Sequence, residues 1–146
     1  MLTRSPLAGV GFYGWVCAGA ASIVLAVPDI TWSQQLVRLT RGEGATILPP
    51  GRSYRLGEKM PNQQPNEITL DGDPIISICC PNPKPSSARQ TSCVTERQVP
   101  LKASRAAVLG RYGRPTNSTP KEEMRYSGVT FHLDGDSVIR ICIVRR

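Results

Sequence analysis

Cysteine is the residue type in this chain whose chemistry is easiest to interpret. The sequence contains five, and Cys17 lies in an apolar N-terminal stretch, where we interpret it as apolar filling. The other four form an even set, which favours disulfides in an exported protein. A zinc site would need paired Cys-x-x-Cys motifs or several histidines, and the sequence has neither. The four remaining cysteines are Cys79, Cys80, Cys93 and Cys142.

We expect one disulfide among these cysteines and regard a second as possible. Cys79 and Cys80 are adjacent, so on a strand they point to opposite faces and serve different partners. We expect a disulfide between Cys80 and Cys93, which would close the proline-rich loop between them. A closed loop of about 13 residues stabilises a fold by on the order of 3 kcal/mol. The remaining pairing, Cys79 with Cys142, requires that their two strands be neighbours.

The histidine and the aspartates, which could also take part in chemistry, are better explained without a reaction centre. His132 is the one histidine in the sequence, close to Asp134 and Asp136, and no motif places a serine or cysteine nucleophile beside it. The pair Asp71 and Asp73 lacks the Asp-x-Asp-x-Asp-Gly spacing of a calcium loop, so we interpret these aspartates as turn residues. We therefore predict no catalytic residue, no metal ligand and no cofactor, and we do not expect an enzyme.

The elements that must position the cysteines contain a repeated phrase. Residues 70–79 and 133–142 share seven of ten positions, and each copy holds an Asp-Gly pair between β-type residues, which is a strong hairpin signal. Alternation then predicts that Cys79 and Cys142 lie on a more polar face of the hairpins. The residues predicted on the opposite, buried face are Ile76, Ile78 and Cys80 in one copy and Ile139, Ile141 and Ile143 in the other.

The remaining pattern is also mainly that of strands and turns. Strands are predicted over 36–40, 45–48 and 53–56, and a short helix is predicted over 103–109, ended by Gly110 or Gly113. A length of 146 residues fits one compact unit. We therefore expect a mainly β fold, a small antiparallel sandwich or barrel-like module, with an N-terminal hydrophobic helix and one short helix.

The N-terminus has the composition of an export segment. Arg4 is followed by an uncharged run over residues 6–28, with small residues at a potential cleavage site near Ala26. The run is also long enough to span a bilayer, so cleavage and anchoring both stay open. We assign 1–28 to a signal peptide or membrane anchor and 29–146 to a single extracytoplasmic domain, periplasmic or extracellular.

Positive charge is concentrated in one region. Residues 81–121 carry eight basic residues against Glu96 alone, which equals the whole formal net charge of +7. Such a region can be an ordinary solvated loop, or it can contact a protein partner, an anionic lipid or an acidic glycan. A nucleic-acid partner is not expected. The candidate anion-binding residues are Lys84, Arg89, Arg97, Lys102, Arg105, Arg111 and Arg114.

Residues 36–95 resemble the FecR-type periplasmic domain, a small β-rich module of bacterial envelope proteins. The resemblance rests on Leu36-Val37-Arg38-Leu39, on the Gly-Arg-Ser-Tyr-Arg-Leu-Gly-Glu stretch at 51–58, and on 75–80 with Cys93 downstream. It implies a non-catalytic sensing or scaffolding domain outside the cytoplasm, and it transfers no catalytic residue. Residues from about 96 onward have no counterpart in that family.

These observations lead to one expected function and one alternative. We expect a non-catalytic envelope or secreted binding or sensing module, which acts through protein or anionic-ligand contacts of the basic region. The alternative is a structural accessory subunit of a membrane-associated complex, held by residues 6–28. An uncleaved leader and stoichiometric partners would favour the accessory subunit.

Overall fold

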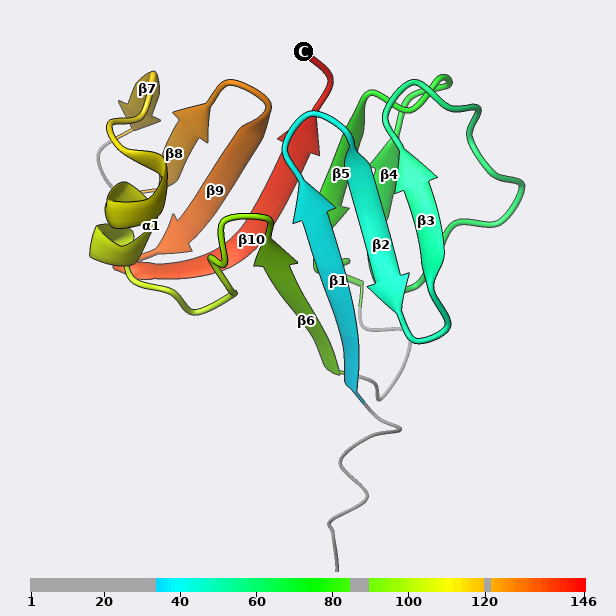
Figure 1. The fold of residues 1–146 in the computed structure, drawn as a ribbon, viewed down its shortest axis with the longest axis horizontal. Coiled ribbons are helices and arrows are strands. Elements are labelled where there is room, and N and C mark those ends of the chain that lie inside the picture. The colour runs from blue at the N-terminus through cyan, green and yellow to red at the C-terminus, as the bar shows by residue number, and fades with distance from the viewer. Residues whose placement is uncertain (1–33, 85–89, 120–121) are drawn as a thin grey trace, which may run out of the picture.

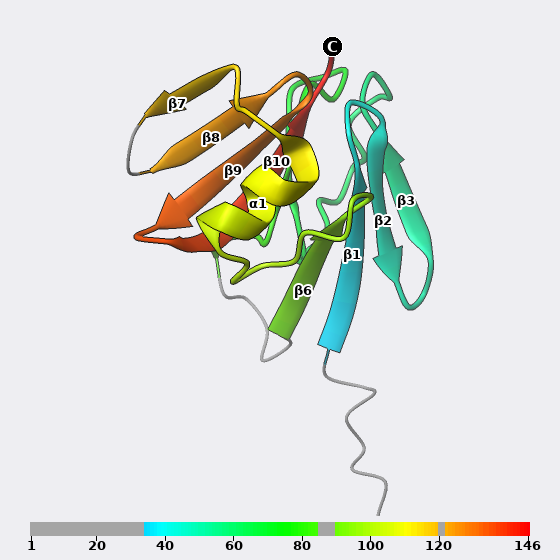
Figure 2. The same ribbon diagram turned by 60° about the vertical axis from the view of Figure 1, so that its left-hand side comes forward.

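The computed structural model describes residues 34–84, 90–119 and 122–146. These parts of the chain form ten strands and one helix, arranged as two facing sheets (Figures 1 and 2). The elements are β1 (Gln34–Thr40), β2 (Gly44–Leu48), β3 (Arg52–Arg55), β4 (Thr69–Asp71), β5 (Ser77–Cys80), β6 (Gln90–Thr95), α1 (Arg105–Tyr112), β7 (Asn117–Thr119), β8 (Glu123–Tyr126), β9 (Val129–Asp134) and β10 (Ser137–Val144). The expectation of a mainly β fold is confirmed.

The two sheets differ in size and in strand direction. One has four strands in the order β3-β2-β1-β6, and the other has six in the order β4-β5-β10-β9-β8-β7. Every neighbouring pair is antiparallel except β1 and β6, which are parallel. The prediction of an antiparallel module was wrong for this pair. The chain reaches β6 from the other sheet and enters it beside the start of β1, with Gln90 opposite Gln34.

The core lies between the sheets and is built by strand alternation. Val37 and Leu39 of β1 face inward with Ile47 of β2, and all three are at most 1% exposed. Phe131 and Ile141 contribute from the larger sheet, also fully buried. Side chains with period two thus give each sheet one apolar face, and the two faces form a single hydrophobic cluster.

Helix α1 covers the part of the larger sheet that the smaller sheet leaves open (Figure 2). Its N-cap is Ser104, whose hydroxyl accepts a hydrogen bond from the Ala107 N–H at 3.2 Å. It ends at Gly113, which has a φ of 75°. The Tyr126 hydroxyl donates to the Gly113 carbonyl at 2.9 Å and so holds this end against the sheet. The predicted short helix is present, and of the two predicted end points Gly113 is the one observed.

The two copies of the repeated phrase lie side by side in the six-stranded sheet. The first copy runs from the end of β4 into β5, the second runs from the end of β9 into β10, and β5 pairs with β10. Cys79 lies opposite Cys142, and these two residues occupy the same position in their copies. Ile78 lies opposite Ile143 and Cys80 opposite Ile141. Strands β5 and β10 are therefore related by a local two-fold axis that passes through the Cys79–Cys142 pair.

The predicted faces of the two copies were wrong at one equivalent position in each. Ile76 is 54% exposed and Ile139 is 52% exposed, whereas their neighbours Ile75 and Val138 are buried. Ile76 precedes β5 and belongs to the turn, while a register shift between Val138 and Arg140 puts Ile139 out of phase. The copies also differ in turn length, because only the second has a two-residue turn, in which Gly135 has a φ of 59°.

The expected disulfide and the second, possible one are both present and have different roles. Cys80–Cys93 connects β5 to β6, and therefore one sheet to the other, with both residues fully buried. Cys79–Cys142 joins the neighbouring strands β5 and β10 of the larger sheet on the opposite face, where each residue is 6% exposed. The fold is thus cross-linked both within a sheet and between the sheets.

The hydrophobic N-terminal helix predicted over 6–28 lies outside the described residues. Among the residues that the structure does describe, no helix is long and apolar enough to cross a membrane.

Removing either disulfide should lower the free energy of unfolding. Loop closure over 63 residues is worth about 4 kcal/mol and over 13 residues about 3 kcal/mol. We expect losses of this size for Cys79→Ala/Cys142→Ala and for Cys80→Ala/Cys93→Ala, with an added packing loss for the second pair because its sulfurs lie in the core. Urea unfolding of each double variant measures this. Unchanged stability in both variants would contradict the assigned pairings.

Alanine substitutions at two glycines should change the stability of the protein in opposite directions. A Cβ on Gly44 would overlap the Tyr54 carbonyl oxygen of the neighbouring strand, so Gly44→Ala should destabilise by on the order of 2 kcal/mol. Gly110 lies in α1 with open space around it, so Gly110→Ala should stabilise by up to about 1 kcal/mol. Thermal unfolding compares the two variants. A Gly44→Ala protein as stable as wild type would show that β2 and β3 are not in the register described.

Candidate functional site

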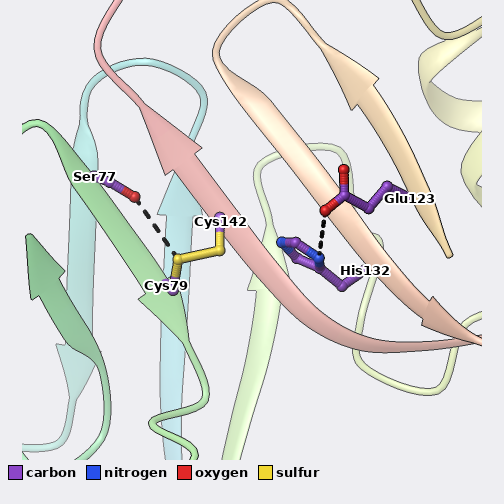
Figure 3. Close-up of a disulfide and its surroundings, with 5 residues drawn as sticks. All are labelled: Ser77, Cys79, Glu123, His132 and Cys142. Carbon is purple, nitrogen blue, oxygen red and sulfur yellow. Dashed lines mark hydrogen bonds and ion pairs between the residues drawn. A yellow bond between two sulfur atoms is a disulfide. The ribbon is translucent and has the colours of Figure 1, made fainter. Parts of the chain in front are cut away.

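The outer face of the six-stranded sheet brings together a histidine, a carboxylate and the outer disulfide. His132 of β9 lies between Arg140 of β10 and Glu123 of β8 in the strand register. Figure 3 shows His132, Glu123 and the Cys79–Cys142 bridge on one side of the sheet. A polar cluster therefore lies beside the local two-fold axis of β5 and β10.

The histidine and the carboxylate lie within hydrogen-bonding distance. His132 Nδ1 lies 3.2 Å from Glu123 Oε1. Glu123 Oε2 accepts from Arg125 Nε at 2.7 Å and lies 2.7 Å from Arg125 Nη2. The sequence placed His132 near Asp134 or Asp136, whereas its partner is Glu123. Alternation indicates only that both side chains face outward, and the β8–β9 register that joins them cannot be deduced from local sequence.

The electrostatic environment favours a neutral imidazole. Burial lowers the pKa of His132 below its ordinary value of 6.5. The Glu123 carboxylate acts in the opposite direction, and the positive charges of Arg140 and Arg125 lower the pKa further. Near neutral pH His132 therefore acts as an uncharged hydrogen-bonding group.

An open hollow of about 640 Å³ adjoins this pair. Its walls carry both signs of charge, since Arg105 comes from α1, Glu123 from β8 and Asp134 from the β9 end. Exposed Ile139 adds an apolar surface. No group of three or more metal-ligating side chains occurs in the parts of the chain that the structure describes. The hollow therefore offers polar and apolar contacts suited to a side chain or a small polar group.

The surroundings of the outer disulfide are also polar. The Ser77 hydroxyl lies 3.7 Å from Cys79 Sγ, as Figure 3 shows. Thr69 pairs with Cys79 on one side and Thr130 pairs with Cys142 on the other. Asp73 Oδ1 accepts the Met60 N–H at 3.1 Å, which connects the turn of the first repeat to the loop that contains Met60. These contacts position the backbone around the bridge.

The basic residues predicted over 81–121 are divided between several places. Arg97 Nη1 donates to the Arg111 carbonyl at 3.0 Å, and its guanidinium lies 5.0 Å from the ring centre of Tyr112. Arg114 follows directly after Gly113, which ends α1. The C-terminal end of α1 thus gathers three of the predicted arginines.

The other basic residues lie elsewhere. The backbone N–H groups of Lys102 and Arg105 donate to Val138 and Asp136, which places both residues beside the β9–β10 hairpin. Lys84 follows β5 and is exposed. The candidate Arg89 lies outside the described residues, and so does Lys121, the last basic residue of the region.

Titration of the single histidine should report its surroundings. We expect the imidazole NMR signal of His132 to titrate with a midpoint below 6.5, because burial disfavours the charged form. Glu123→Gln should lower the midpoint further and Arg140→Gln should raise it. Because the folded-state pKa is lowered, the unfolded chain takes up the proton at higher pH than the native state does. This contribution to the free energy of unfolding is therefore fully present above pH 6.5, and it is lost as the pH falls from 6.5 through the folded-state pKa. A titration midpoint above 6.5, or a midpoint that does not change in the Glu123→Gln variant, would contradict the pairing of His132 with Glu123.

Comparison of the chain with protein-family models, with curated protein sequences and with solved structures finds no match.

Proposed function

We propose that the protein is an exported, non-catalytic binding module that contacts an anionic or protein partner through the C-terminal end of α1. The observation that supports export is the pair of disulfides, one within the larger sheet and one between the sheets. Disulfides form and persist in oxidising compartments, and four of the five cysteines are used in this way. The interpretation of 1–28 as an export segment agrees with such a compartment.

The proposed contact consists of Arg97, Arg111 and Arg114. All three are exposed, and within the described parts of the chain no carboxylate lies within 4.0 Å of their charged groups. Arg97 is held by its bond to Arg111 and by the Tyr112 ring. A prepositioned arginine loses less conformational freedom on binding, and its planar group suits carboxylates and phosphates.

The family resemblance and the alternative function stay predictions. A FecR-like sensing role agrees with a β-rich domain outside the cytoplasm and rests on residues 36–95 alone. The accessory-subunit role depends on residues 6–28, which lie outside the described residues.

The proposal predicts salt-sensitive binding that depends on the end of α1. The full chain is titrated with heparin, with polyglutamate and with anionic vesicles at low and high salt. Binding to at least one probe should weaken steeply with salt, and Arg111→Gln/Arg114→Gln should weaken it roughly tenfold.

The matched control is Lys84→Gln/Lys102→Gln, which removes the same charge from two exposed lysines of the predicted basic set. The structure places both away from the end of α1, Lys84 after β5 and Lys102 beside the β9–β10 hairpin. It should change binding much less. Absent or salt-independent binding to all three probes would refute the proposal, and so would equal weakening by the control.

A further inference from the structure

A second group of arginines lies at one end of the sandwich and was not among the predicted site residues. Arg145 and Arg146 end the chain described, and both pack against turn glycines. A Cβ built on Gly42 would lie 3.0 Å from Arg146 Nε, and one built on Gly57 would lie 3.5 Å from Arg145 Cζ. Both glycines have positive φ, so their turns present bare backbone on which a guanidinium can lie.

Arg41 and Arg146 converge on a third glycine. A Cβ on Gly128 would lie 3.2 Å from Arg41 Cγ and 3.3 Å from Arg146 Nε. Arg41 Nε also donates to the Ser127 carbonyl oxygen. Within the described residues no carboxylate lies within 4.0 Å of either guanidinium. Two positive charges held side by side without a counter-ion repel one another, and a bound anion would relieve this repulsion.

This pair continues into the arginines at the end of α1. Strands β1 and β6 end side by side, because Leu39 lies opposite Thr95 and the Glu96 N–H donates to the Leu39 carbonyl at 2.9 Å. Arg41 and Arg97 follow these two strand ends, and the Arg97 guanidinium lies 5.0 Å from the ring centre of Tyr112. Figure 1 shows the C-terminus and the β1–β2 and β8–β9 turns at the same end of the molecule. We call Arg145, Arg146, Arg41 and Arg97 the arginine row.

The shape of the arginine row indicates an extended partner. Its members come from the β1–β2 turn, the β6 end and the C-terminus, and they rest on three different turns. Guanidinium groups bind carboxylate and sulfate groups through paired hydrogen bonds. A row of such groups suits a polymer with repeated negative charges better than a single small anion.

The arginine row lies at the far end of β1 from the first described residue. The chain enters the described structure at Gln34 and reaches Arg41 only after the full length of β1, roughly 20 Å away. We infer that the arginine row binds an acidic polysaccharide. This inference rests on the proposed function only for the extracytoplasmic location, where such glycans are met.

The test uses a heparin oligosaccharide as the probe and the full chain. Arg41→Gln/Arg146→Gln should weaken binding at least about tenfold, and Lys84→Gln/Lys102→Gln should change it less than about threefold. Because Arg41 also supports the Ser127 turn, Arg145→Gln/Arg146→Gln, at two exposed positions, is measured beside it and should weaken binding similarly. Thermal unfolding verifies that each variant is folded.

Several results would overturn the inference. Heparin affinity that is unchanged in both arginine-row variants, or lowered no more than in the control, would show that the row is not a site. Preferential binding of polyglutamate or of anionic vesicles would refute the claim that the partner is a polysaccharide. The proposed function would survive these results if Arg111→Gln/Arg114→Gln still weakened binding to one of those probes.

Discussion

The antiparallel pairing of β5 with β10 is the contact on which the rest of the structure depends. It places Cys79 opposite Cys142, so that a disulfide can join the two copies of the repeated phrase at the local two-fold axis of the two strands. The same pairing turns Cys80 inward, where it bonds to Cys93 of the other sheet. One strand register thus determines how the two copies join in the larger sheet and the covalent link between the sheets.

Much of this arrangement could be predicted from the sequence because it depends on side-chain alternation. Adjacent cysteines must face opposite ways, so each needs its own partner. Alternation failed at Ile76 and Ile139, where a turn and a register shift move the side chains into solvent. It also says nothing about strand order, so the parallel pairing of β1 with β6 could not be deduced.

The candidate sites were less predictable, because they join residues far apart in the chain. Regional charge identified the arginines around α1, but not the convergence of Arg41 and Arg146 on the Gly128 turn. His132 was recognised as the single histidine, while its partner Glu123 depends on the β8–β9 register. Binding surfaces built by turns of two sheets require the three-dimensional fold.

The oxidation state of the cysteines tests the central claim most directly. Protein recovered from the extracytoplasmic fraction is denatured, alkylated without reductant and weighed intact. The account predicts no label on Cys79, Cys80, Cys93 and Cys142, and labelling of all four once a reductant is added. Labelling of these cysteines without reductant would contradict both the cross-linked fold and the export that it supports.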